Sequence, residues 1–291
     1  MIKKKLIKNA IKVDKFLINY LKKQKKTLLV KPMKYGVISG GKKIRSTIIF
    51  DFGKIFKISE KKLINICAAV ECIHSYSLIH DDLPCMDNDN MRRGKPSTHI
   101  KFGEASAVLA GSSLLTLAFE IITEKKYFLN SRMKNEIIKF LASCSGHTGI
   151  AGGQELDLKF ENKKIKINKI IDMQKKKTGK LFNFCLYAVG VIANKTTKEK
   201  KYLSNLGEEI GLLFQLSDDF LDKKGSKHLV GKPVKKDNKK GKSTLLKLMG
   251  EKKAYMYANN LKKKILLKLE KHGKKAKELI STIEFILERK F

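Results

Sequence analysis

Apolar residues recur along most of the chain with the period of an α-helix. In the segment 200–222, Leu203, Leu206, Ile210 and Leu213 follow one another at steps of three, four and three residues, which places them on one buried helix face. The same period runs through five further segments: 62–82, 104–122, 132–145, 169–193 and 251–268. Alternating strand patterns are rare, so the sequence predicts an all-α fold, a helical bundle.

Breaks in the helical pattern are few. The chain has four prolines, with none between Ser97 and Lys232, which permits long helices because proline disrupts helix interiors. Segments rich in Gly, Asn or Lys are predicted to be loops at helix ends: 39–41, 88–94, 151–153 and 223–241. No Pro/Ser-rich linker divides the 291 residues, and we therefore expect a single domain over 1–291.

The charge is strongly positive. The 63 Lys and Arg residues against 28 Asp and Glu give a formal charge of +35, which suits a nucleic acid, an anionic membrane surface or a phosphorylated small molecule. The lysines are spread from Lys3 to Lys290, without a basic tail or a known nucleic-acid-binding module. We expect no nucleic-acid partner; a basic helical nucleic-acid-binding protein, recognised by steeply salt-dependent binding, is the alternative from another functional class.

The cysteines and the longest apolar run bear on the compartment. Five cysteines, an odd number without a C-x-x-C pair, favour reduced thiols in a cytoplasmic protein. The longest nearly unbroken apolar run, 184–193, is about ten residues long, against the ~20 that span a bilayer. No transmembrane segment is predicted.

The first cluster of carboxylates is HDDLPCMDNDNMRRG, residues 80–94. Asp81, Asp82 and Asp87 crowd the end of an otherwise apolar helix. Because Pro84 makes a continuous helix unfavourable, a local loop could bring Asp87 back toward Asp81.

The second cluster is FQLSDDFLD, residues 214–222. Asp218 and Asp222 have the i, i+4 spacing of one helix face, and Gln215 extends this polar stripe. Carboxylates late in a helix oppose its dipole and repel each other, so they call for a cation. Magnesium is commonly held by a few carboxylates while substrate phosphates fill its other positions. Two such clusters facing each other would bind a diphosphate through Mg²⁺.

Basic residues accompany both clusters. Lys42 and Arg45 follow paired glycines in GGKKIRS, residues 40–46, and Arg92 and Arg93 follow the first acidic cluster. Backbone amides, point charges and guanidinium groups together suit a diphosphate.

A lysine-rich segment, GKPVKKDNKKGKST at 231–244, resembles a P-loop but is not one, because Lys236 replaces a required glycine. Lys232 and Lys242 remain plausible diphosphate contacts.

His74 lies on the helix face that Val70, Ser77 and Asp81 share, at steps of four, three and four residues. An isolated histidine on such a helix is most often a core residue. Its position two turns before Asp81 favours a substrate contact instead.

Taken together, GGKKIRS, VECIHSYSLIHDDLPCMDNDNMRRGKPSTHIKFGEASAVLAG, KTGKLF, FQLSDDFLD and GKPVKKDNKKGKST resemble, in this order, the motifs of the trans-prenyl diphosphate synthases, and most closely those of bacterial farnesyl diphosphate synthases. The resemblance covers roughly residues 36–245. It implies a helical bundle around a deep central cavity, usually a homodimer, in which the two acidic motifs face each other across the mouth of the cavity and ligate magnesium.

The resemblance also implies a role for each motif residue. Magnesium, more than one ion per site, would be bound by Asp81, Asp82, Asp87, Asp218 and Asp222. Isopentenyl diphosphate would be held by Lys42, Arg45, His74 and Arg93. The allylic diphosphate would be held by Arg92, Lys177, Lys232 and Lys242. Catalytic side chains that line the space of the carbocation would be Lys177, Thr178 and Gln215.

The resemblance implies head-to-tail condensation of isopentenyl diphosphate with dimethylallyl and geranyl diphosphate. Product length in the family depends on the turn before the first acidic motif, where Tyr76 and Ser77 stand. With an aromatic residue at this position, the chain resembles the bacterial synthases that make fifteen-carbon products. A geranyl or geranylgeranyl diphosphate synthase is the alternative within the family. Ser46 stands where the family usually has proline, and Asn88 where close relatives often have another aspartate.

Overall fold

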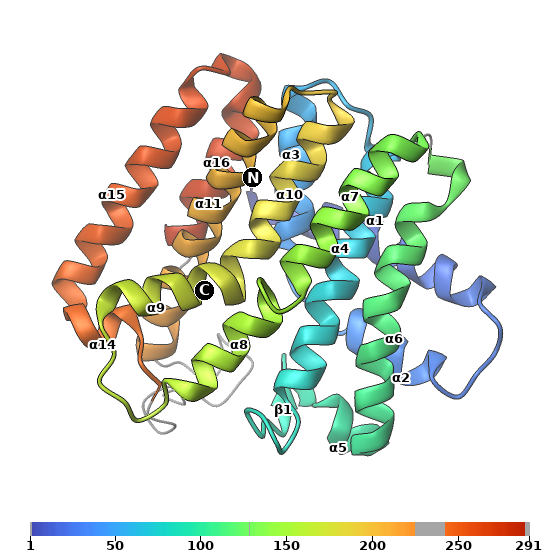
Figure 1. Cartoon of the computed structure of the whole chain (residues 1–291). Coiled ribbons are helices and arrows are strands. Elements are labelled where there is room, and N and C mark those ends of the chain that lie inside the picture. The colour runs from blue at the N-terminus through green and yellow to red at the C-terminus, as the bar shows by residue number, and fades with distance from the viewer. Residues whose placement is uncertain (1, 128, 225–241, 289–291) are drawn as a thin grey trace.

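The computed structural model describes residues 2–127, 129–224 and 242–288, which form a bundle of helices (Figure 1). In chain order the elements are α1 (Ile2–Lys23), α2 (Val30–Val37), α3 (Ile44–Ile55), α4 (Glu60–Asp81), β1 (Met91–Arg92), β2 (Lys95–Pro96), α5 (Thr98–Phe102), α6 (Glu104–Thr123), η1 (Lys125–Tyr127), α7 (Ser131–Ser145), α8 (Ile150–Lys159), α9 (Ile167–Gln174), η2 (Lys175–Gly179), α10 (Lys180–Ile192), α11 (Thr197–Lys224), α14 (Leu245–Met249), α15 (Glu251–Glu270), η3 (Gly273–Ala276) and α16 (Lys277–Glu288). The predicted all-α fold is confirmed.

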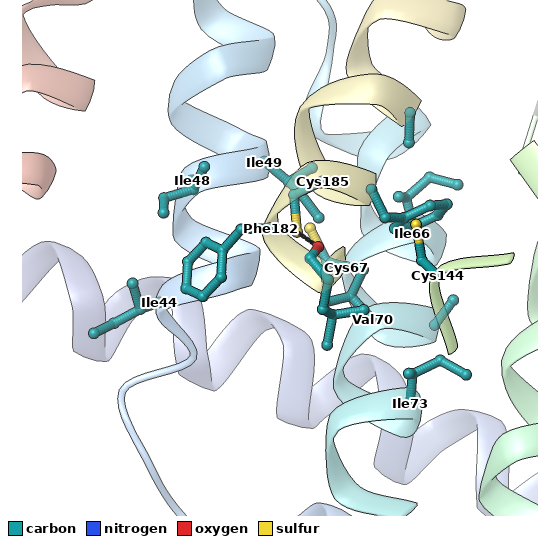
Figure 2. Close-up of a cluster of buried hydrophobic side chains, with 14 of the residues drawn as sticks. Ile44, Ile48, Ile49, Ile66, Cys67, Val70, Ile73, Cys144, Phe182 and Cys185 are labelled. Atoms are coloured by element: carbon teal, nitrogen blue, oxygen red, sulfur yellow. Dashed lines mark hydrogen bonds between the residues drawn. The ribbon is translucent and has the colours of Figure 1, made fainter. Parts of the chain in front are cut away.

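The core forms where α3, α4, α7, α10 and α11 meet. Figure 2 shows Ile48 of α3, Val70 of α4 and Phe182 of α10 converging on this region. The thiols of Cys67 and Cys185 lie among them, buried and free. Burial of these apolar surfaces is the main term that holds the helices together.

The six predicted helical segments all correspond to helices. The predicted loop at 151–153 is wrong, and residues 225–241 of the predicted loop at 223–241 lie outside the described residues. Ala151, Gly152 and Gly153 lie in the first turn of α8, which begins at Ile150. The glycines permit close packing instead of a break: a Cβ at Gly153 would lie 2.2 Å from the backbone nitrogen of Lys177. Glycine here brings α8 against η2.

Two described helices, α4 and α6, are long and apolar enough to meet a composition test for membrane spans. The apolar window of α4 is 72% buried in the bundle and that of α6 is 44% buried. The buried helix of any helical bundle meets the same test, so it is weak evidence for a span. One face of α6 exposes apolar residues, including Val108 (41%) and Leu109 (53%).

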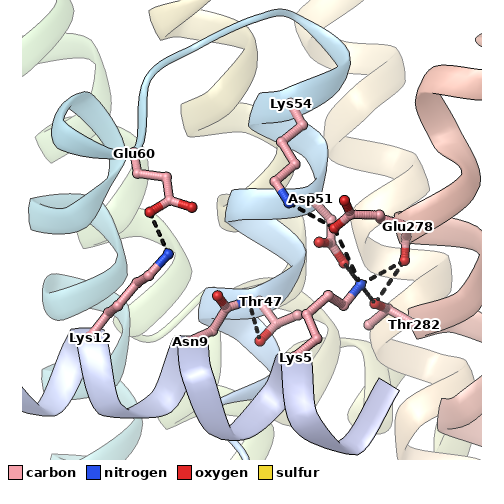
Figure 3. Close-up of polar contacts among 9 residues, drawn as sticks. All are labelled: Lys5, Asn9, Lys12, Thr47, Asp51, Lys54, Glu60, Glu278 and Thr282. Atoms are coloured by element: carbon pink, nitrogen blue, oxygen red, sulfur yellow. Dashed lines mark hydrogen bonds and ion pairs between the residues drawn. The ribbon is translucent and has the colours of Figure 1, made fainter. Parts of the chain in front are cut away.

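A polar cluster joins the first and last helices to α3 (Figure 3). Asp51 of α3 is buried, and its Oδ2 accepts hydrogen bonds from Lys5 Nζ of α1 at 2.7 Å and from Thr282 Oγ1 of α16 at 2.6 Å. Segments at the two ends of the chain are thereby fixed to one helix of the core.

Candidate active site

The first acidic cluster lies at the end of α4, where the helix stops at Asp81. The loop after Pro84 turns back, and the backbone nitrogen of Asp87 donates to the carbonyl oxygen of Asp81 at 2.8 Å. The sequence predicts this return. Burial raises the pKa of Asp81 to about 6, with Lys177 opposing the shift and the negative charge of Asp87 adding to it.

Two lysines from distant segments meet at this cluster. Lys177 Nζ of η2 lies 2.6 Å from Asp157 Oδ2 of α8, and Lys242 Nζ lies 3.0 Å from the same oxygen and 3.0 Å from Asp87 Oδ1. Burial opposes ionisation of Asp157, but the two lysines lower its pKa to about 2. Asp157 therefore holds both ammonium groups beside the carboxylates of α4 and its loop.

Asp82 faces a different partner. Arg92 Nε of β1 donates to both carboxylate oxygens of Asp82 at 3.0 Å, and its Nη2 also contacts Oδ1. Asp82 is buried, so this ion pair fixes the guanidinium of Arg92 against the end of α4. Metal support by Asp82 and diphosphate binding by Arg92 stay predictions.

The second acidic cluster is linked to the first through η2, a single turn of π-helix at Lys175–Gly179. Lys177 interacts electrostatically with Asp81 and Asp87, and the next residue, Thr178, donates from Oγ1 to Gln215 Oε1 of α11 at 2.6 Å. The predicted ligands Asp218 and Asp222 follow on α11, and both are partly buried. The structure thus connects the polar stripe of α11 with the residues around Asp81.

Three residues predicted to hold isopentenyl diphosphate lie close to one another. Burial lowers the pKa of His74 well below its usual value, and the positive charges of Arg45 and Arg93 lower it further. His74 is therefore neutral at pH 7. Arg93 donates from Nη1 to Ser39 Oγ at 3.2 Å and to the carbonyl oxygen of Gly40, so it braces the glycine-rich loop.

Arg45 and Lys42 each lie near an aromatic ring. The guanidinium carbon of Arg45 lies 4.7 Å from the ring centroid of Phe182. Lys42 Nζ lies 5.6 Å from the ring centroid of Phe285 on α16. Lys232 falls outside the described residues.

A buried ion pair beneath the glycine-rich loop was not predicted. Lys43 Nζ lies 3.2 Å from Asp14 Oδ1 and 3.8 Å from Glu71 Oε2. Ser46, at the position where the resemblance expects proline, donates from Oγ to Glu71 Oε1 at 2.7 Å. Proline would have no hydroxyl to offer Glu71.

The two residues predicted to control product length lie on α4. Tyr76 is buried, and its hydroxyl donates to the carbonyl oxygen of Ser145 at 3.2 Å. Its ring packs edge to face on His80, with centroids 5.6 Å apart. The Ser77 hydroxyl donates to the carbonyl oxygen of His74 at 2.9 Å. Tyr76 is therefore rigidly held between α4 and the end of α7.

The carboxylates could bind magnesium in pairs, with water or phosphate as the other ligands of the ion, and they do not enclose it completely. Within residues 2–127, 129–224 and 242–288, no group of three or more His, Cys, Asp or Glu side chains could share a metal. Magnesium keeps several water or phosphate ligands and needs only one or two carboxylates. Asp81 and Asp87 offer such oxygens at one place, and Asp218 and Asp222 offer them on α11. The donor set fits the ion.

Asp157 and Lys43 are the site residues that sequence reasoning missed. Asp157 follows the paired glycines of 152–153 by four residues, and an acidic residue soon after two packed glycines was the available signal. Lys43 has φ of 42°, a left-handed conformation that is uncommon for lysine, and no sequence pattern indicated it.

Comparisons with known proteins agree with this geometry. The polyprenyl synthetase family profile matches residues 26–283. The farnesyl diphosphate synthase of Bacillus subtilis (strain 168) is 40% identical over 256 residues, which are 87% of this chain and 82% of that protein. Farnesyl diphosphate synthases of other bacteria match at similar identity.

Solved structures give the same result. A Zymomonas mobilis FPP/GFPP synthase without ligands superposes with a TM-score of 0.88 at 35% identity, covering 98% of each chain. A Helicobacter pylori geranyltransferase in complex with magnesium and isoprenyl diphosphate superposes with a TM-score of 0.80 at 30% identity, covering 98% of this chain and 96% of that one. The chain therefore belongs to the polyprenyl synthetase family, as a prenyltransferase whose bacterial relatives are farnesyl diphosphate synthases.

Proposed function

We propose that the chain makes farnesyl diphosphate, by Mg²⁺-dependent condensation of isopentenyl diphosphate first with dimethylallyl and then with geranyl diphosphate. The observation that carries the proposal is the meeting of Asp81, Asp87, Lys177 and Lys242 around the buried Asp157. Acidic and basic groups so arranged can bind a metal and a diphosphate together. The magnesium and isoprenyl diphosphate bound to the Helicobacter pylori relative support the same chemistry here.

In this proposal Asp81, Asp87 and Asp218 hold the ions, with Asp82 and Asp222 in support. The chemistry that magnesium supplies is neutralisation of the departing diphosphate. Arg92, Lys177, Lys232 and Lys242 hold the same leaving group. Positive charge directed at developing negative charge lowers the barrier to ionisation.

We assign the second diphosphate, that of isopentenyl diphosphate, to the other group of predicted basic residues. Lys42, Arg45, His74 and Arg93 hold isopentenyl diphosphate, and neutral His74 can accept or donate one hydrogen bond without adding charge. Because both substrates are then bound with the alkene beside the allylic carbon, the bimolecular reaction becomes effectively unimolecular. Thr178 and Gln215 line the space where the cation forms.

The test is incubation of the purified protein with isopentenyl diphosphate and either dimethylallyl or geranyl diphosphate, with and without Mg²⁺. We expect a fifteen-carbon diphosphate only when Mg²⁺ is present. A ten- or twenty-carbon main product would favour the alternatives within the family. No prenyl product, together with salt-sensitive binding of nucleic acid unaffected by Asp81→Ala, would refute the proposal.

We further propose a single domain over 1–291, a homodimer and a cytoplasmic location. Val108 and Leu109 on the exposed face of α6 support the homodimer, since exposed apolar patches commonly mark protein interfaces. The free thiols suit a reducing compartment. Light scattering on the eluting protein should give twice the chain mass, and a monomer at micromolar concentration would contradict the homodimer.

A further inference from the structure

Asp219 adjoins the predicted metal ligand Asp218 on α11, yet its side chain is buried. Each of its carboxylate oxygens accepts a hydrogen bond from a side-chain amide. Gln215 Nε2, one turn earlier on α11, donates to Oδ1 at 2.9 Å, and Gln174 Nε2, at the end of α9, donates to Oδ2 at 3.0 Å. Asp219 therefore joins α9 to α11.

These bonds fix the direction of a longer hydrogen-bond chain. A carboxylate only accepts, whereas a primary amide has a donor end and an acceptor end. Because Asp219 receives the amino group of Gln215, the carbonyl oxygen of Gln215 faces away and accepts from Thr178 Oγ1 at 2.6 Å. The single hydroxyl hydrogen of Thr178 is thus committed, and only oxygen lone pairs remain for another neighbour.

The backbone allows this contact through an unusually close approach of two helical segments. A Cβ at Gly211 of α11 would lie 2.6 Å from the Cα of Gly179. Gly179 ends the π-helical turn that contains Thr178, and such turns occur frequently at functional sites. The geometry keeps Thr178 within reach of Gln215.

We propose that Asp219 and Gln174 are positioning residues that set the direction of the hydrogen bonds through Gln215 to Thr178. Oxygen lone pairs, not hydrogen atoms, then face the allylic cation. The inference rests on the proposed function, in which Thr178 and Gln215 line the space of that cation. Fixed acceptor dipoles stabilise a positive centre, and reversed ones oppose it. Asp219 thereby differs from Asp218 and Asp222, to which metal binding is assigned.

Substitutions at Asp219 and Gln174 can either keep or reverse the direction of the hydrogen bonds through Gln215 to Thr178. In Asp219→Asn the new side chain can donate to either glutamine, so both directions are open. Adding Gln174→Glu supplies a partner that only accepts, which restores the original direction. Adding Gln174→Lys instead supplies a partner that only donates, which reverses it. Gln174→Lys alone leaves Asp219 as acceptor for both neighbours and controls for the added charge.

The readout is kcat with isopentenyl and geranyl diphosphates. We expect kcat to fall by roughly a factor of two in Asp219→Asn, where the two directions have similar populations. It should return to within about twofold of wild type in Gln174→Glu/Asp219→Asn. In Gln174→Lys/Asp219→Asn it should fall roughly 10- to 100-fold, the usual effect of one misplaced hydrogen bond to a charged centre. The kcat of Gln174→Lys alone measures the effect of the added charge, and the lysine double variant is compared with it.

Both KM values and the Mg²⁺ concentration for half-maximal activity should stay unchanged, and melting temperatures verify that each variant is folded. The inference fails if adding Gln174→Glu does not restore the kcat of Asp219→Asn. It also fails if the fold-loss of kcat in Gln174→Lys/Asp219→Asn is no larger than the product of the fold-losses in its two single variants. Recovery of Asp219→Asn by excess Mg²⁺ would make Asp219 a metal ligand instead. An inactive wild-type protein would refute the proposed function and not this inference alone.

Discussion

At the scale of single residues, the site depends on carboxylates whose ionisation is controlled by neighbouring lysines. Asp157 is the clearest case, because it accepts from Lys177 at 2.6 Å and from Lys242 at 3.0 Å. Its pKa in the folded protein, about 2, lies below the ordinary value of 3.8. The stability that this ionised group contributes is therefore complete above about pH 4 and is lost as the pH falls toward 2.

Asp157→Asn should remove this pH dependence. Between pH 6 and pH 2.5, the free energy of unfolding of the wild type should fall by about 2 kcal/mol more than that of the variant, as a shift of nearly two pKa units requires. Urea denaturation at several pH values measures both. If the free energy of unfolding fell equally with pH in the two proteins, Asp157 would not be held ionised by its lysines.

Tyr76 gives a second prediction at this scale. Its ring is buried and its hydroxyl is fixed to the carbonyl oxygen of Ser145, so its bulk cannot easily move aside. Tyr76→Ala should remove the bulk of the ring and shift the main product beyond fifteen carbons, whereas Tyr76→Phe should keep the wild-type product. Chromatography of the dephosphorylated products measures this, and an unchanged product in Tyr76→Ala would remove Tyr76 from the control of chain length.

At the scale of elements, glycines set how closely the helices around the site approach. Gly211→Ala should destabilise the protein by about 2 kcal/mol, because the new Cβ would lie 2.6 Å from the Cα of Gly179 and force α11 away. Gly190→Ala, also between α10 and α11, meets side-chain atoms of Leu203 and Lys200 at 3.0 and 3.3 Å, and the nearest backbone atom, the Cα of Lys200, is 3.8 Å away. It should stay within about 1 kcal/mol of wild type. Thermal unfolding distinguishes them, and equal losses would contradict the packing argument.

The sequence predicts elements better than it predicts side-chain partners. The helical period locates α4, α6 and α11 because each buries a continuous apolar face, and Pro84 explains the return of Asp87 to Asp81. Which of two adjacent aspartates faces inward depends on neighbours from other segments. Asp219 turns toward Gln174, 45 residues away, and no local pattern contains that information.

At the scale of the whole molecule, the N-terminal and C-terminal helices are fixed to the core through Asp51 (Figure 3). Asp51→Ala should cost about 3 kcal/mol, since it leaves Lys5 and Thr282 without their buried acceptor. Lys54→Ala in the same cluster should cost about 0.5 kcal/mol, because the Lys54–Glu278 pair is exposed. Chemical denaturation measures both losses. Similar values for the two variants would deny Asp51 this role.

The central claim is that carboxylates from α4 and α11 act together on one magnesium-bound diphosphate. The most direct test is turnover of geranyl and isopentenyl diphosphates by Asp81→Asn and by Asp218→Asn, with the exposed Asp172→Asn as control. The account predicts a loss of roughly 100-fold or more in each of the first two, with unchanged melting temperature and full activity in the control. Wild-type turnover in either Asp81→Asn or Asp218→Asn would contradict it.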